Sequence, residues 1–128
     1  MAELSRETQI RLLESLGVNV QVRKGRVHYL ESIDEDSPVL ADAASFVYEV
    51  MEKHAALEGL VRRRLRTQEE AIDEMASRLR ITKDNIQRWQ REHRGDSEIE
   101  YVAKTLQEAL GAKLDSLPVR EARIYRNY

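Results

Sequence analysis

A short polar stretch in the second half of the chain carries side chains that suit hydrogen bonding to the edges of nucleic-acid bases. Arg88 can donate two hydrogen bonds to guanine, and Asn85 and Gln87 can each bond adenine through two atoms. Lys83 and Arg91 belong to the same stretch. If the apolar residues of this segment point inward on a helix, all five remain for its outer face. Such a set is typical of readout in a DNA major groove.

Local start and stop signals indicate which elements would position these side chains. A capping box at residues 67–70, with Thr67 as N-cap, predicts a helix that ends near Leu79. Arg80 and Ile81 are then expected to form a tight turn. Thr82 caps a second helix that runs to about residue 93, so the segment is predicted to form two short helices joined by a turn.

Apolar residues around this turn have a characteristic spacing. Ala76 is the small residue at which the two helices would cross closely. Apolar residues follow it at positions +3, +5, +10 and +13, which are Leu79, Ile81, Ile86 and Trp89. The stretch resembles the helix-turn-helix motif of bacterial and phage repressors and of transposase DNA-binding domains. The resemblance covers residues 67–94 and departs at Arg80, where that family usually has glycine.

This resemblance implies that the second helix enters the major groove of double-stranded DNA. The expected DNA contacts are Thr82, Lys83, Asn85, Gln87, Arg88, Arg91 and Arg94. Further phosphate contacts are expected from Arg62, Arg63, Arg66 and Arg78. A basic cluster at Arg23, Lys24 and Arg26 has two interpretations: a wing that contacts the minor groove, or a charged turn that keeps the chain in solution.

Charge is distributed unevenly along the chain. The net charge of −2 does not by itself favour DNA. Residues 59–94, however, carry 10 basic and 6 acidic side chains, whereas residues 1–58 carry 6 and 11. The basic central third is the part that a polyanion would meet.

The first part of the chain predicts a helix followed by a β-hairpin. Ser5 is a plausible N-cap of a helix that ends at Leu16, and Gly17 suits its C-terminal cap. Apolar and polar residues then alternate in residues 18–23, and residues 26–30 return after a turn at Lys24 and Gly25. A two-residue turn predicts antiparallel pairing, with Val22 opposite Val27 and Val20 opposite Tyr29.

Two further amphipathic helices follow. Ser37 and Pro38 start one that extends to the arginines at residues 62–66, with Gly59 as a point where it bends or breaks. A second capping box at Ser97 starts a helix that extends to about Ser116, just before Pro118. Its apolar stripe serves either as a third core helix or as a self-association surface. The apolar tail at residues 119–128 suits docking on a neighbour.

The predicted fold is therefore mainly α with one small β-hairpin: a helix, the hairpin and a long helix, followed by a helix-turn-helix and a C-terminal helix. Three parts are predicted, at residues 1–58, 59–118 and 119–128. One helix-turn-helix contacts only half of a two-fold site, so we expect a homodimer formed through the C-terminal helix or the hairpin.

Several classes of function have no support in the sequence. The three histidines lack metal-type spacing, the glycines form no phosphate-binding loop, and no catalytic arrangement is present. We therefore expect no enzymatic activity, no cofactor and no metal. The lack of cysteine, of a membrane-spanning apolar run and of a signal-peptide pattern predicts a cytoplasmic protein.

The sequence thus predicts a DNA-binding protein, most simply a small transcriptional regulator. Two alternatives stay open at this point. One is a helical protein-interaction or assembly subunit, which the acidic overall balance and the apolar C-terminal stripe favour. The other is a phage-type DNA-packaging accessory protein that binds DNA with less sequence specificity.

Overall fold

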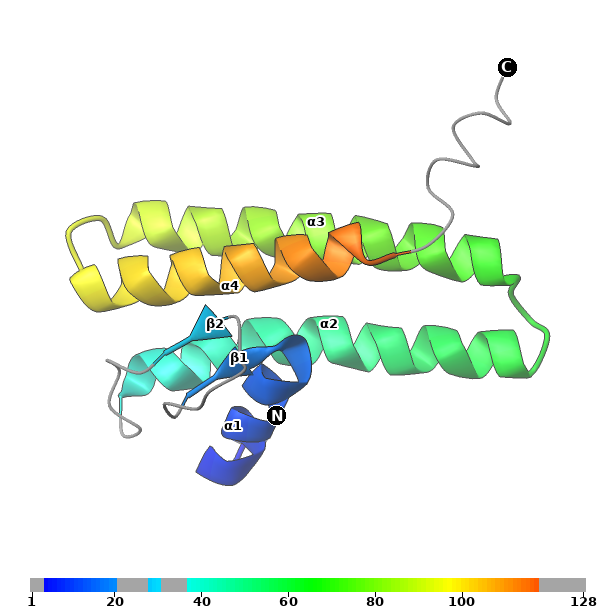
Figure 1. The fold of residues 1–128 in the computed structure, drawn as a ribbon, viewed down its shortest axis with the longest axis horizontal. Coiled ribbons are helices and arrows are strands. Elements are labelled where there is room, and N and C mark those ends of the chain that lie inside the picture. The colour runs from blue at the N-terminus through cyan, green and yellow to red at the C-terminus, as the bar shows by residue number, and fades with distance from the viewer. Residues whose placement is uncertain (1–3, 21–27, 31–36, 118–128) are drawn as a thin grey trace, which may run out of the picture.

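The computed structural model describes residues 4–20, 28–30 and 37–117. Within these ranges the chain forms four helices and two short strands (Figure 1). In chain order they are α1 (Arg6–Leu16), β1 (Val18–Asn19), β2 (His28–Tyr29), α2 (Pro38–Arg62), α3 (Gln68–Glu92) and α4 (Ser97–Asp115). The predicted mainly α class with a small β element is confirmed.

The two longest helices, α2 and α3, run antiparallel and form the frame of the molecule (Figure 1). Each has 25 residues, whereas α4 has 19 and returns along α3. Helix α1 packs on α2 near the end of the frame where α2 begins, and the strands lie between α1 and α4. As a consequence, the other end of the α2–α3 pair extends beyond the last turn of α4 (Figure 1).

One hydrophobic core joins all of these elements. Its fully buried side chains come from α1, α2, α3 and α4, and include Leu13, Leu40, Leu79, Ile86 and Leu106. Helix α4 packs chiefly on α3 and to a smaller extent on α2. It is therefore a core helix, as one of the two sequence interpretations predicted.

Most of the predicted helix ends are confirmed. The Ser5 side chain accepts a hydrogen bond from the Thr8 amide, and Gly17 closes α1 with a left-handed φ of 101°. Ser37 caps α2, with Pro38 in its first turn. The capping box of α3 is also present, because Thr67 and Glu70 exchange hydrogen bonds of 2.9 and 3.1 Å between side chain and backbone.

The cap of α4 differs by one residue from the prediction. The Asp96 side chain, not that of Ser97, accepts hydrogen bonds from the amides of Glu98 and Ile99. A carboxylate at this position also complements the positive end of the helix dipole. Pro118 and the tail lie outside the described residues.

The predicted turn at Arg80 and Ile81 is wrong. Helix α3 passes through both residues without interruption, so residues 67–94 do not form a helix-turn-helix. Thr82 is not an N-cap but a buried side chain inside the helix, and Ile81 is 45% exposed.

The uninterrupted spacing of buried residues explains this outcome. The inward-facing side chains are separated alternately by three and four residues, in the order Ile72, Met75, Leu79, Thr82, Ile86 and Trp89. That spacing keeps one face of a single helix against the core. No glycine or proline occurs in α3 to stop it.

The β strands pair in the opposite sense to the prediction. Val18 and Asn19 pair in parallel with His28 and Tyr29, and the Leu30 amide donates to the Asn19 carbonyl at 2.7 Å. Val18 and Asn19 are both buried instead of alternating, since α1 and α4 contact this segment. Strands covered on both faces are typical of parallel pairing. Residues 21–27, with the predicted turn and wing, lie outside the described residues.

The division of the chain at residues 58 and 59 stays a prediction. Helix α2 runs continuously across this point and does not break at Gly59. Its end lies at Arg62, followed by the basic loop.

The continuity of α3 gives a direct test at Arg80, whose side chain is exposed. In a continuous helix, Arg80→Gly should be less stable than Arg80→Ala by about 1 kcal/mol. Urea unfolding measures this difference. Ser77→Gly and Ser77→Ala, at an exposed position one turn earlier, should differ by the same amount. A glycine variant at position 80 as stable as the alanine variant would contradict the continuous helix, because glycine suits a turn.

Candidate interaction groove

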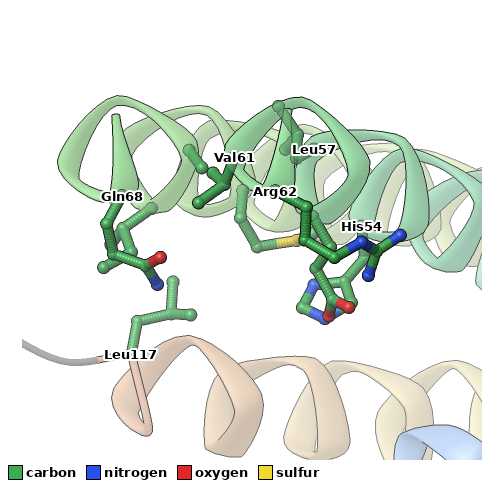
Figure 2. A pocket seen from close by; sticks show the side chains of 10 residues that line it. His54, Leu57, Val61, Arg62, Gln68 and Leu117 are labelled. Carbon is green, nitrogen blue, oxygen red and sulfur yellow. The ribbon is translucent and has the colours of Figure 1, made fainter. Parts of the chain in front are cut away.

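A groove opens at the end of the frame that α4 does not reach. It lies between α2 and α3 beyond the last turn of α4, with a volume of about 380 Å³ (Figure 2). The side chains that line it are His54, Leu57, Glu58, Val61, Arg62, Gln68, Ala71, Ile72, Met75 and Leu117. Six of these ten are apolar, so the groove resembles a site for apolar side chains with a polar margin.

The apolar floor of the groove follows from the spacing of the two helices. Leu57 and Val61 lie one turn apart on α2, and Ile72 and Met75 lie one turn apart on α3. Leu57, Ile72 and Met75 are buried by packing against their neighbours, whereas Val61 is half-buried. The same inward faces that hold α4 elsewhere therefore continue past its end.

Leu117 forms the end wall of the groove. Its side chain points from the end of α4 toward the side chains of α2 and α3 (Figure 2). The Leu117 amide still donates to the Leu114 carbonyl at 3.2 Å, which holds it in the last turn after α4. The groove is thus a direct continuation of the trough that α4 occupies.

Polar side chains line the margin. His54 and Glu58, one turn apart on α2, are in contact through Nε2 and Oε1. Arg62 and Gln68 complete the margin on α2 and α3. A bound segment would find both hydrogen-bonding groups and charges of either sign here.

The loop after α2 is basic and strained. Arg64 has a φ of 60°, in the left-handed region that costs a non-glycine residue about 1 kcal/mol. Leu65 beside it is 65% exposed. Arg66 and Arg78 both approach Glu74, at 3.7 and 3.9 Å, so two of the four expected phosphate contacts share one carboxylate. Arg62 and Arg63 are exposed.

The outer face of α3 holds only part of the expected DNA-contact set. Gln87, Arg88 and Arg91 of that set are exposed there, together with Arg80 and the acidic Asp84, which were not part of it. Arg94, just after the helix, is exposed as well.

Three other expected contacts are placed differently. Thr82 is 5% exposed and cannot reach a phosphate, so that prediction is wrong. Asn85 and Lys83 are half-buried, and Lys83 Nζ lies beside Gly111 of α4. Lys83 therefore belongs to the side of α3 that faces α4, and neither residue lies on the outermost face.

Polar side chains of α3 and α4, among them Gln90, Lys104 and Gln107, line a second pocket. In the described segments, no group of three or more potential metal ligands is close enough to hold an ion. The Tyr48 pKa is raised by a hydrogen bond with Glu52, and His28 approaches Glu108 at 3.9 Å. No described helix is long and apolar enough to cross a membrane.

Comparison of the chain with protein-family models, with curated proteins and with solved structures finds no match. A fold does not define a function by itself. The function is therefore inferred from the groove and from the outer face of α3.

The sequence predicted an amphipathic helix that extends to residues 62–66, but it did not single out the groove that Leu57 and Val61 line. The missing signal was helix length. Once α3 is one helix of 25 residues, its partner α2 of equal length overhangs the shorter α4 by several residues. The supposed turn at residues 80 and 81 concealed this difference.

Glu70, in the capping box beside the groove, provides a test by pH. Its pKa lies below the ordinary value because the carboxylate accepts hydrogen bonds from the backbone and the side chain of Thr67. A lowered folded-state pKa stabilises the fold above the unfolded-state pKa, and this contribution is lost as pH falls through the folded-state pKa.

Glu70→Ala should therefore lower Tm at neutral pH, and the difference from the wild type should shrink in acid. Thermal unfolding followed by circular dichroism across this pH range measures it. Thr67→Ser, which keeps a hydroxyl acceptor at the cap, should stay close to the wild type. A Tm difference for Glu70→Ala that does not change with pH would contradict this role.

Proposed function

We propose that the protein is a helical protein-interaction subunit whose groove binds a helix of a partner chain. One observation carries this proposal: the trough between α2 and α3 accepts α4 along most of its length and continues, still apolar, beyond Leu117. No described element covers this part of it (Figure 1). Helix-in-groove binding is a common way in which such a surface is used.

Helix α4 indicates what kind of segment would fit. Its side chains facing the trough recur every three or four residues, as in Leu106, Leu110 and Leu114. A partner helix would present large apolar residues at the same spacing. Its flanks would carry polar residues that pair with Glu58 and Arg62 on the margin.

DNA binding is the second candidate. The exposed Arg80, Gln87, Arg88 and Arg91 on α3 support it, because these side chains suit bases and phosphates. The helix-turn-helix motif no longer supports DNA binding, because α3 is one continuous helix. On this proposal α3 would approach the duplex as one straight helix. Both a transcriptional regulator and a packaging accessory protein fall within this candidate.

We also propose the expected homodimer, but its contact surface cannot be the apolar stripe of α4. The apolar stripe of α4 is buried within the chain, as Val102, Leu106 and Leu110 show. The C-terminal helix therefore cannot present that stripe to a second copy. A cytoplasmic location is proposed on the sequence grounds given above.

Peptide selection tests the interaction proposal. The full chain is used to select from a displayed library of helical peptides. Val61 is half-buried, so Val61→Glu should leave the fold intact while placing a charge in the groove. Selected peptides should carry apolar residues at helical spacing and bind Val61→Glu at least about tenfold more weakly, a loss of about 1.4 kcal/mol.

Ser45→Glu is the matched control, because Ser45 is exposed on the same helix outside the groove. It should bind the selected peptides like the wild type. Failure to enrich any peptide, or equal binding by Val61→Glu, would reject the groove as the binding site.

Binding to random-sequence duplex DNA at low and moderate salt tests the second candidate. Combining Arg88→Ala with Gln87→Ala should leave the melting curve unchanged and weaken binding by about 1–3 kcal/mol for each base that the variant can no longer bond. Lys53→Ala, an exposed cation on α2, is the control.

Enrichment of a sequence motif would favour a regulator, and salt-sensitive binding without enrichment would favour a packaging protein. Absence of binding at low salt would reject the DNA candidate. The same site preference in the double variant would exclude these two residues as the reading side chains.

A further inference from the structure

We propose that the partner helix of the groove is acidic. Its apolar side faces the groove floor, and its carboxylates pair with the arginines where α2 ends and the loop to α3 begins. This inference rests on the proposed function and names the chemical class of partner for the same site. It follows from the position of the loop, from its charge and from an exposed leucine within it.

The loop between α2 and α3 borders the groove. Arg62, which ends α2, and Gln68, which begins α3, both line the groove, so residues 63–67 connect two of the lining side chains. The loop is anchored to α2, because the Leu65 amide donates a hydrogen bond to the Leu60 carbonyl at 2.9 Å. Its side chains are therefore presented at the groove edge from a backbone that is held in place.

This edge of the groove carries positive charge that the chain does not neutralise. Residues 62–66 contain four arginines and no acidic residue. Arg66 approaches Glu74 at 3.7 Å. Arg62, Arg63 and Arg64 are exposed and form no ion pair with any carboxylate of the described ranges. Three cations are thus available to a bound segment.

The acidic side chains nearby are not available in the same way. Four of them belong to the first turns of α3 but do not line the groove, and they are Glu69, Glu70, Asp73 and Glu74. Helical spacing places them on other sides of α3 than the lining residues Gln68 and Ile72. Glu58 does line the groove, but it contacts His54 through Nε2. A bound helix would therefore meet available arginines and an engaged carboxylate.

Charge complementarity then selects the partner. Opposite charges across an interface accelerate association and favour the matching partner, whereas like charges suppress the wrong one. Arginine in particular can form two parallel hydrogen bonds with one carboxylate. An acidic helix matches this edge of the groove, and a basic helix is repelled by it.

An exposed leucine favours a protein partner over a nucleic acid. Leu65 lies between Arg64 and Arg66 and is 65% exposed. DNA phosphates would pair with the arginines but would offer no apolar surface to Leu65. An amphipathic acidic helix offers carboxylates and apolar side chains together.

Three designed helical peptides test this inference. All three carry leucines at the spacing of Leu106, Leu110 and Leu114 on α4, and their polar positions are rich in glutamate, glutamine or lysine. Fluorescence anisotropy measures their binding to the full chain at low and moderate salt. Each exposed ion pair contributes roughly a two- to fivefold gain in affinity. The glutamate peptide should therefore bind at least about tenfold more tightly than the lysine peptide, and added salt should reduce this difference.

A variant without the three available cations tests which residues select the peptide. It combines Arg62→Gln, Arg63→Gln and Arg64→Asn. Asparagine is used at position 64 because it tolerates the left-handed φ of 60° there. This variant should bind the glutamate peptide about tenfold more weakly than the wild type does, and it should no longer distinguish the glutamate from the lysine peptide.

The matched control removes three exposed cations that do not line the groove, through Arg11→Gln, Lys53→Gln and Lys104→Gln. Its net charge changes by the same amount. Circular dichroism verifies that both variants are folded. The control should keep the preference of the wild type for the glutamate peptide.

Equal binding of the three peptides would overturn the inference, and so would tighter binding of the lysine peptide or an equal loss in the control. Random-sequence duplex DNA and the protein alone are measured in parallel. DNA binding that the arginine variant loses, without any preference among the peptides, would assign these arginines to phosphates. Self-association that the same variant loses would assign them to a second copy of the chain. Either result would overturn the acidic partner helix.

Val61→Glu separates this inference from the proposed function, because the charge in the groove should weaken binding of all three peptides. If no peptide binds the wild type and the displayed library yields none, the proposed function fails and the inference fails with it. If peptides bind the groove without regard to their charge, the inference alone fails.

Discussion

The packing of one apolar stripe on α3 against α2 and α4 is the interaction on which the rest of the structure depends. Leu79 and Ile86 in this stripe are fully buried, and the stripe runs the length of the helix. Burial of each such side chain contributes roughly 1.5–3 kcal/mol. Because the stripe has no break, α3 stays straight, pairs with α2 over its full length and leaves α4 too short to cover both.

The candidate site is a consequence of that mismatch in length. The groove uses the same kinds of side chain as the core, and it is accessible because α4 ends at Asp115. Function is thus proposed where an apolar surface continues beyond the element that covers it. The charged outer face of α3, by contrast, is mixed in sign, since Asp84 lies among the exposed arginines.

Helix caps and buried faces could be predicted from the sequence because each depends on neighbouring residues. Ser5, Ser37 and Thr67 cap helices as expected, and Trp89 is buried as expected. Whether the helix is interrupted at Arg80 could not be predicted from the neighbouring residues alone. The spacing of Ala76, Leu79, Ile86 and Trp89 fits two crossing helices as well as one straight helix. The two arrangements differ in the residue that is buried, which is Ile81 in two crossing helices and Thr82 in one straight helix. The parallel pairing of β1 and β2 likewise depends on α1 and α4, which lie far away in sequence.

Amide hydrogen exchange at residues 79–83 reports whether α3 is hydrogen-bonded through the middle of its length. A continuous α3 predicts protection of these amides similar to that at Met75 and Ile86 on either side. Fast exchange confined to Arg80, Ile81 and Thr82, between two protected segments, would contradict it. That result would restore two helices and a turn, and the groove at the end of a single long α3 would lose its basis.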